Sequence, residues 1–182
     1  GSQVVRLKGG DPFIFGRGSE ECLELRQAGI EFQLIPGISS CSGVPGMSGI
    51  PLTHRGTAAN FAVFTGHAAG GSLFGIDWEL AARVDTAVFL MGVRHLREIV
   101  SNQIAFGRSP QTPVAIIERG TMPEQKIYRG NLANIAEKAA EAEPPAIIVI
   151  GDVVEIGEAI GKLGCPAIRE IPDQPQSFIV NA

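Results

Sequence analysis

Short, almost continuously apolar segments alternate with segments of helical periodicity along the chain, and this alternation restricts the fold more than any other feature. Strands without polar alternation are typical of sheets covered on both faces, and strand–helix alternation is typical of parallel sheets. The sequence therefore predicts an α/β architecture with a largely parallel sheet. A turn containing Gly120 and Pro123 predicts a hairpin, which would make the second sheet mixed. The predicted strands are 3–8, 31–35, 61–65, 86–91, 113–117, 125–128 and 146–150.

The helical segments are marked by capping residues or by apolar periodicity. Ser19, followed by Glu20 and Glu21, is expected to cap a helix that stops at Gly29, because an acidic first turn suits the positive end of the helix dipole. Further helices are expected at 38–50, where a loop is the alternative, at 93–104, and after a cap at Asn131.

A break near Pro51 divides these elements into domains. Residues 1–51 are expected to be the remainder of an N-terminal parallel α/β domain, 52–165 a complete C-terminal α/β domain with a mixed sheet, and 166–182 an irregular tail. Only two predicted strands precede the break, and two strands do not make a stable sheet. Either the first 50 residues add to the second sheet, or the chain has lost its beginning.

Composition excludes several classes of protein. Lysine plus arginine total 15 against 19 acidic residues, a net charge of −4, so a nucleic-acid partner is not expected. Cys22, Cys41 and Cys165 have neither disulfide nor zinc-ligand spacing, so reduced cysteines and no metal site are expected. No apolar run approaches the roughly 20 residues of a membrane span, and no signal peptide is recognisable. We expect a soluble, cytoplasmic protein that binds no membrane.

The segment with the most candidate functional residues is 6–18, Arg-Leu-Lys-Gly-Gly-Asp-Pro-Phe-Ile-Phe-Gly-Arg-Gly. Two glycines after a predicted strand allow a ligand to approach the backbone, and Asp11 could accept hydrogen bonds from its amine or hydroxyl groups. The alternative is a tight turn, for which Gly-Gly-Asp-Pro is also well suited. The phosphate-binding and α/β-hydrolase motifs are absent, and Glu21 stands where a dinucleotide fingerprint needs its third glycine.

The sequence resembles the uroporphyrinogen-III C-methyltransferases of the tetrapyrrole methylase superfamily. The resemblance runs from residue 4 to about 165. The motifs that carry it are 4–18 (VVRLKGGDPFIFGRG), 36–40 (PGISS), 49–55 (GIPLTHR), 63–67 (VFTGH), 88–92 (VFLMG), 113–121 (PVAIIERGT) and 148–154 (IVIGDVV).

The resemblance implies a two-domain, typically homodimeric methyltransferase that uses S-adenosylmethionine and releases S-adenosylhomocysteine. It would methylate two pyrrole rings of uroporphyrinogen III to give precorrin-2, which leads to sirohaem and cobalamin. The cofactor contacts that the resemblance implies are Gly9, Gly10, Asp11, Ile14, Ser39, Ser40, Met91, Gly120 and, in a less distinctive stretch, Ala146.

The tetrapyrrole substrate is rich in carboxylates, so basic side chains are expected at its site. The substrate-binding candidates are Arg6, Lys8, Arg17, His54 and Arg55, with His67 and Arg119 as further basic residues near the motifs. The family's first glycine-rich loop and its proposed acid–base residues would lie upstream of residue 4, so no catalytic residue is assigned. Ser39-Ser40-Cys41 and Gly56-Thr57 also differ from the usual family residues.

Three interpretations remain open on these grounds. In the first, the intact protein is a uroporphyrinogen-III C-methyltransferase and this chain is roughly its last two-thirds. In the second, the chain is a non-catalytic fragment that binds cofactor or tetrapyrrole weakly or only associates with itself. In the third, it is a sister enzyme acting on a later precorrin. Because an incomplete first sheet would expose an apolar edge, self-association into an oligomer or domain-swapped form is expected.

Overall fold

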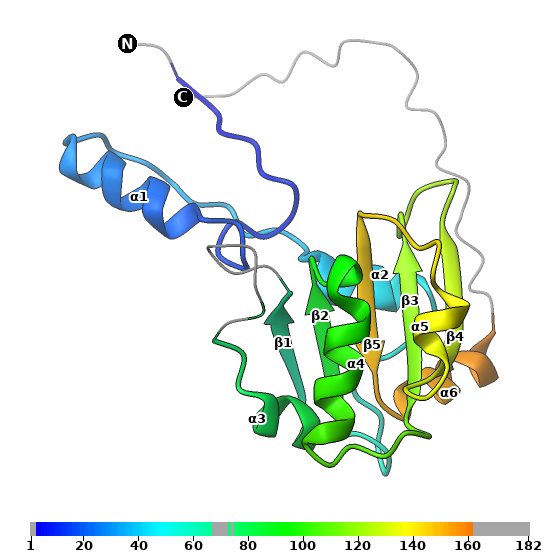
Figure 1. The fold of residues 1–182 in the computed structure, drawn as a ribbon. Helices are drawn as coiled ribbons and strands as arrows, with labels where there is room; N and C mark the ends of the chain where they lie inside the picture. The colour runs from blue at the N-terminus through cyan, green and yellow to red at the C-terminus, as the bar shows by residue number, and fades with distance from the viewer. Residues whose placement is uncertain (1–2, 67–72, 74, 162–182) are drawn as a thin grey trace.

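The computed structural model describes residues 3–66, 73 and 75–161, and these residues form one five-stranded mixed sheet with helices on both faces (Figure 1). The strand order is β1-β2-β5-β3-β4. The bounds are β1 Phe61–Thr65, β2 Thr86–Leu90, β3 Pro113–Glu118, β4 Lys126–Asn131 and β5 Ala146–Ile150. Among the described strands, only β1 and β2 pair in parallel, and the other three pairings are antiparallel. The mixed sheet and the hairpin are confirmed, but the largely parallel sheet is wrong.

The three central strands, β2, β5 and β3, are buried almost throughout because both faces of the sheet are covered. Phe89, Ile116 and Ile148 point to the face covered by α3 (Trp78–Arg83), α4 (Leu96–Ala105) and α5 (Ile135–Lys138). Val88 and Val149 point to the other face, against α2 (Ser40–Met47) and α6 (Val153–Ile160). Strands that are apolar on both sides thus reflect a three-layer arrangement rather than a parallel sheet.

Two predicted strands, 3–8 and 31–35, do not form, and both segments have no regular secondary structure. A strand needs the N–H and C=O groups of a neighbour, and no described strand lies beside either segment. Their apolar side chains remain exposed instead, with Val4 at 85%, Leu7 at 80% and Ile35 at 75%. Together with α1 (Gly18–Gln27), which projects away from the sheet in Figure 1, they form an arm that contributes nothing to the core of the sheet.

The predicted helices are present with shifted ends. The cap of α1 is Arg17, so Ser19 lies inside the helix rather than at its start. The segment at 38–50 contains α2, and the segment at 93–104 contains a 3₁₀ turn, Val93–His95, followed by α4. The helix expected after Asn131 is the short α5, which begins after Asn134 because Asn131 is the last residue of β4. Helices α3 and α6 are additional to those that the sequence pattern predicts.

Arg108, 8% exposed, lies on the side of the sheet opposite the carboxyl ends of β2 and β3 and connects several segments there. Its guanidinium donates to the carbonyl oxygens of Ala82 (3.2 Å), Ile150 (3.4 Å) and Val84. Burial lowers the pKa of Arg108, and nearby Asp152 and Asp85 oppose that effect.

None of the helices in the described residues is both long and apolar enough to span a membrane. His67, Cys165 and the tail expected at 166–182 lie outside the described residues.

Candidate functional site

A hollow of about 700 Å³ opens above the ends of the central strands, on the side where β2 and β3 end and β5 begins. The loop at 8–16 and helix α2 form one side of it, and the segments 90–91, 117–122 and 145–147 form the other. Carboxyl ends of strands are the usual ligand-binding edge of α/β sheets. The hollow is therefore the candidate functional site.

All nine residues that the resemblance implies as cofactor contacts line this one hollow, although they come from five separate segments of the chain. They are Gly9, Gly10, Asp11, Ile14, Ser39, Ser40, Met91, Gly120 and Ala146. The fold thus brings the whole predicted set together. That these residues bind a cofactor stays a prediction.

Asp11 joins the two loops that lie above the strand ends. Its Oδ1 accepts a hydrogen bond from the N–H of Phe13 (2.8 Å), and its Oδ2 accepts one from the N–H of Gly37 (3.2 Å). The two loops also pack closely, because a Cβ on Gly37 would lie 2.8 Å from the carbonyl oxygen of Gly10. Each carboxylate oxygen retains a lone pair for a ligand, so Asp11 can both shape the site and bind in it.

Helix α2 presents its first turn to the hollow. Ser39 caps the helix, with its hydroxyl accepting from the N–H of Cys41 (3.4 Å), and Ser40 and Gly43 line the wall. The N-terminal end of a helix carries partial positive charge, which favours a carboxylate or phosphate nearby. A ligand with an anionic group is therefore suited to this side of the hollow.

Backbone strain is concentrated at the hollow, and no sequence pattern indicates it. Five non-glycine residues in the described part of the chain have positive φ, and four of them line the hollow. These four are Phe15 (φ 50°), Met91 (φ 56°), Arg119 (φ 48°) and Thr121 (φ 71°). Such strain persists where the surrounding structure enforces it, commonly at ligand sites.

The predicted basic residues are dispersed. Lys8 lines the hollow, but its Nζ is 2.8 Å from Glu21 Oε1, which also lies 3.2 Å from Arg6 Nη2. The hydrogen bond from Lys8 chiefly, with that from Arg6, lowers the pKa of Glu21. Arg17 pairs with Glu20 at 3.3 Å on the arm. Arg119, on the opposite wall of the hollow, lines it directly.

His54 and Arg55 lie away from the hollow. The His54 bridge to Ala58 is followed at once by Ala59 and Asn60, whose N–H groups donate to Asp85 at the beginning of β2. The beginning of β2 lies on the side of the sheet opposite the hollow, which opens where β2 ends. A role for these two residues in substrate binding stays a prediction, and in this arrangement they do not reach the site.

Behind the wall of the hollow lies a buried carboxylate that no sequence motif marks as functional. Glu118, 4% exposed, accepts hydrogen bonds from the hydroxyl of Tyr128 (3.2 Å) and the N–H of Glu143 (3.2 Å). Burial first, and then the charge of Glu118, raise the pKa of Tyr128. Glu118 therefore ties the β3–β4 hairpin to the segment that leads into Pro145 and Ala146 of the hollow.

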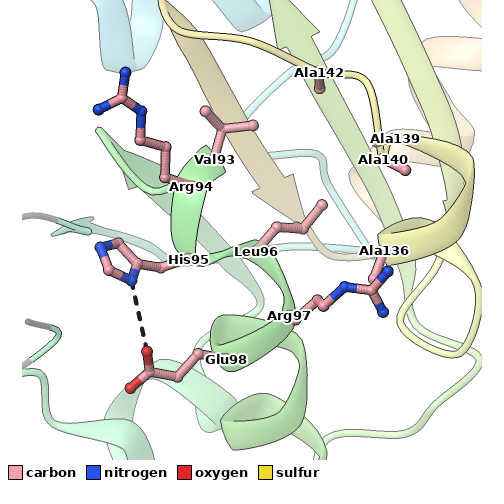
Figure 2. Close-up of a pocket in the computed structure, with 10 residues that line it drawn as sticks. All are labelled: Val93, Arg94, His95, Leu96, Arg97, Glu98, Ala136, Ala139, Ala140 and Ala142. Atoms are coloured by element: carbon pink, nitrogen blue, oxygen red, sulfur yellow. Dashed lines mark ion pairs between the residues drawn. The ribbon is translucent and has the colours of Figure 1, made fainter.

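A second, smaller hollow of about 370 Å³ lies between the start of α4 and α5 (Figure 2). Arg94, His95 and Arg97 are among the residues that line it, and Nδ1 of His95 is 3.6 Å from Glu98 Oε2. None of the predicted cofactor contacts lies there. Nor do His, Cys, Asp and Glu cluster in threes anywhere in the described residues in a way that could hold a metal ion.

Comparison with known proteins gives a consistent set of relatives. A protein-family model described as Tetrapyrrole (Corrin/Porphyrin) Methylases matches residues 1–136. The chain is 46% identical over 165 residues to "Siroheme synthase 3" of Aeromonas hydrophila subsp. hydrophila, covering 90% of this chain and 35% of that protein. It is 45% identical to "Siroheme synthase 1" of Pectobacterium atrosepticum, covering 100% of this chain and 38% of that one. The chain thus spans a little over a third of these curated relatives.

Solved structures agree on the fold. A uroporphyrin-III C-methyltransferase from Thermus thermophilus, complexed with S-adenosylhomocysteine, is 41% identical with a TM-score of 0.75, covering 84% of this chain and 67% of that one. The native form of the Thermus thermophilus enzyme gives a TM-score of 0.76, with 65% of that chain covered. A cobalt precorrin-4 methyltransferase, at 21% identity and a TM-score of 0.73, shares the fold.

Proposed function

This chain belongs to the tetrapyrrole methylase family, and on that premise we propose that its 700 Å³ hollow binds S-adenosylmethionine and, after transfer, S-adenosylhomocysteine. One observation carries the proposal: all nine predicted cofactor contacts line this single hollow. The Thermus thermophilus relative complexed with S-adenosylhomocysteine, 41% identical, supports it.

We propose further that the protein to which this chain belongs methylates uroporphyrinogen III to precorrin-2, on the route to sirohaem and cobalamin. The siroheme synthases at 45–46% identity and the Thermus thermophilus enzyme support this reaction. S-adenosylmethionine supplies an electrophilic methyl group on sulfur. The chain's own residues hold and orient the reactants, which can lower a barrier by several kcal/mol, about 7–11 at best.

Roles for the named side chains follow from their positions. The Asp11 carboxylate and the start of α2 would bind the polar groups of the cofactor, and the exposed apolar side chains of Ile14 and Met91 would contact its less polar part. Lys8 and Arg119 line the hollow and would hold substrate carboxylates. None of the described residues is assigned as the base that removes the substrate proton.

Calorimetric titration of the chain with S-adenosylhomocysteine tests the cofactor proposal. We expect saturable binding of one ligand per chain. Arg97→Ala, in the second hollow, serves as the matched control and should bind equally well. No heat at several temperatures, together with no rise in melting temperature, would contradict the proposal. Product mass with uroporphyrinogen III and with later precorrins separates the proposed reaction from that of a sister enzyme.

We also propose that the chain self-associates as a homodimer through its arm. The exposed apolar side chains Val4, Val5, Leu7 and Ile35 support this, because such patches are rare on monomers. Light scattering across a concentration series should show a dimer that Leu7→Lys and Ile35→Lys weaken. A monomer at every concentration would overturn the proposal.

A further inference from the structure

All three methionines of the chain line the candidate site. Met47 ends α2, Met91 follows β2, and Met122 lies in the turn between β3 and β4. These positions are far apart in the sequence and come from three different elements. The fold therefore gathers every thioether of the protein at one hollow.

Each of these side chains is accessible. Met47 is 47% exposed, Met91 51% and Met122 54%, whereas the described residues of the sheet core are almost fully buried. The thioether sulfurs are thus within reach of water and of small oxidants. The hollow that they line also has the apolar residues Ile14, Leu90 and Ile117 in its wall.

We propose that Met47, Met91 and Met122 are a site of oxidative modification, and that their conversion to sulfoxides by a peroxide closes the hollow to its ligand. The inference rests on the proposed function, because the ligand is the one proposed there. A lone pair of the sulfur attacks one oxygen of hydrogen peroxide, and the O–O bond breaks. The sulfur loses two electrons and becomes a sulfoxide, while the other oxygen takes up a proton and leaves as water.

The chemical change has a direct consequence for binding. A sulfoxide is polar and accepts hydrogen bonds, whereas the thioether contacts apolar and aromatic groups well. A ligand that covered the sulfoxide oxygens would strip them of water without offering donors on its apolar face, which is unfavourable. Three such groups around one hollow should lower affinity by at least about tenfold.

The experiment compares the protein before and after treatment with hydrogen peroxide, followed by dithiothreitol to reverse sulfenic acids and disulfides of the cysteines. Peptide mass mapping measures oxidation at each methionine, and calorimetry measures the affinity for S-adenosylhomocysteine. We expect all three methionines to gain one oxygen, more slowly when S-adenosylmethionine is present, because its sulfonium sulfur is not a thioether and does not consume the peroxide. Affinity should fall at least about tenfold and return after treatment with methionine sulfoxide reductases.

A variant with leucine at all three positions separates thioether from thiol chemistry. Its affinity after peroxide is compared with its own affinity before, and this ratio should stay near one. An equal loss in that variant, or an oxidised natural chain that binds unchanged, overturns the inference and leaves the proposed function standing. An untreated chain that binds no S-adenosylhomocysteine overturns the proposed function and the inference together.

Discussion

The carboxylate of Asp11 accepts a hydrogen bond from the backbone N–H of Gly37 at 3.2 Å, across 26 residues of sequence. Its other oxygen is bound by the N–H of Phe13, so both oxygens have backbone partners. The glycine-rich loop at 8–16 is therefore attached to the segment that enters α2. Since both loops line the hollow and neither belongs to the sheet core, this attachment governs the shape of the site more than the stability of the fold.

Replacing Asp11 with alanine should therefore weaken binding and leave the fold nearly intact. We expect the affinity for S-adenosylhomocysteine to fall at least about tenfold, since two hydrogen bonds to a charged group are lost. Calorimetry and a melting curve measure the two effects. Asp77→Ala is the matched control: Asp77 also accepts a backbone N–H, from Leu80 at 2.9 Å, but caps α3 at the other edge of the sheet. It should cost about 1 kcal/mol of stability and no affinity.

Gly120 is a position where a single methyl group should disturb the site. A Cβ there would lie 3.0 Å from Cγ2 of Val44 in α2, and closer still to Cγ1. Gly120→Ala should push the turn and the helix apart and lower the free energy of unfolding by about 1–3 kcal/mol. Because both segments line the hollow, the affinity for S-adenosylhomocysteine should fall as well. Val44→Ala in the same chain should restore binding. Gly46→Ala, with open space around the new methyl group, should leave the affinity for S-adenosylhomocysteine unchanged. A loss of affinity as large as that of Gly120→Ala would show that the contact with Val44 is not the cause.

The titration of Tyr128 tests the buried carboxylate behind the site. Burial and Glu118 raise the pKa of Tyr128 above its ordinary value of 10.0, so the folded state favours the neutral phenol. The stability that this provides is complete below pH 10.0 and is lost as the pH rises through the raised value. Tyr128 is the only tyrosine, so phenolate absorbance reports it alone. Its midpoint should be higher in the folded chain than in denaturant, and Glu118→Gln should lower it; equal midpoints would disprove the environment described.

The core strands can be predicted from the sequence because apolar runs such as 86–90 and 146–150 have no stable place except between two covering layers. The same pattern misleads at 3–8 and 31–35. Apolar alternation shows what a segment would bury, but not whether a neighbouring strand is there to pair with it. Helix α6 escapes prediction because Gly157 interrupts its pattern, yet this glycine allows the helix to pack against Ile50.

The site is predictable only in part, for a related reason. Its glycines, Asp11 and the serines stand in recognisable motifs, so the family resemblance is enough to select them. No sequence motif marks Met47 and Met122, because they line the hollow only through elements that meet in the fold. The positive φ angles of Phe15 and Arg119 cannot be inferred either, since residues of these types rarely adopt that conformation.

Glu21 pairs with Lys8 and Arg6, two of the basic residues that are predicted to bind the substrate. It binds Lys8 and Arg6 through one oxygen, so Glu21→Gln should free both cations and raise the affinity for a polycarboxylate such as uroporphyrin III several-fold, most at low salt. Glu79→Gln is the control, because it removes the same charge beside Arg83 at the far edge of the sheet.

Acidification should break the same two ion pairs as Glu21→Gln, but it also removes charge from the carboxylates of uroporphyrin III, so affinities are compared near pH 7. The pKa of Glu21 lies below its ordinary value of 4.5, so its ion pairs persist above pH 4.5 and are lost as the pH falls through the lowered value. Fluorescence titration with uroporphyrin III near pH 7 measures the effect of both substitutions. If Glu21→Gln and Glu79→Gln raise the affinity equally, net charge alone explains the gain, and Lys8 and Arg6 do not bind the substrate.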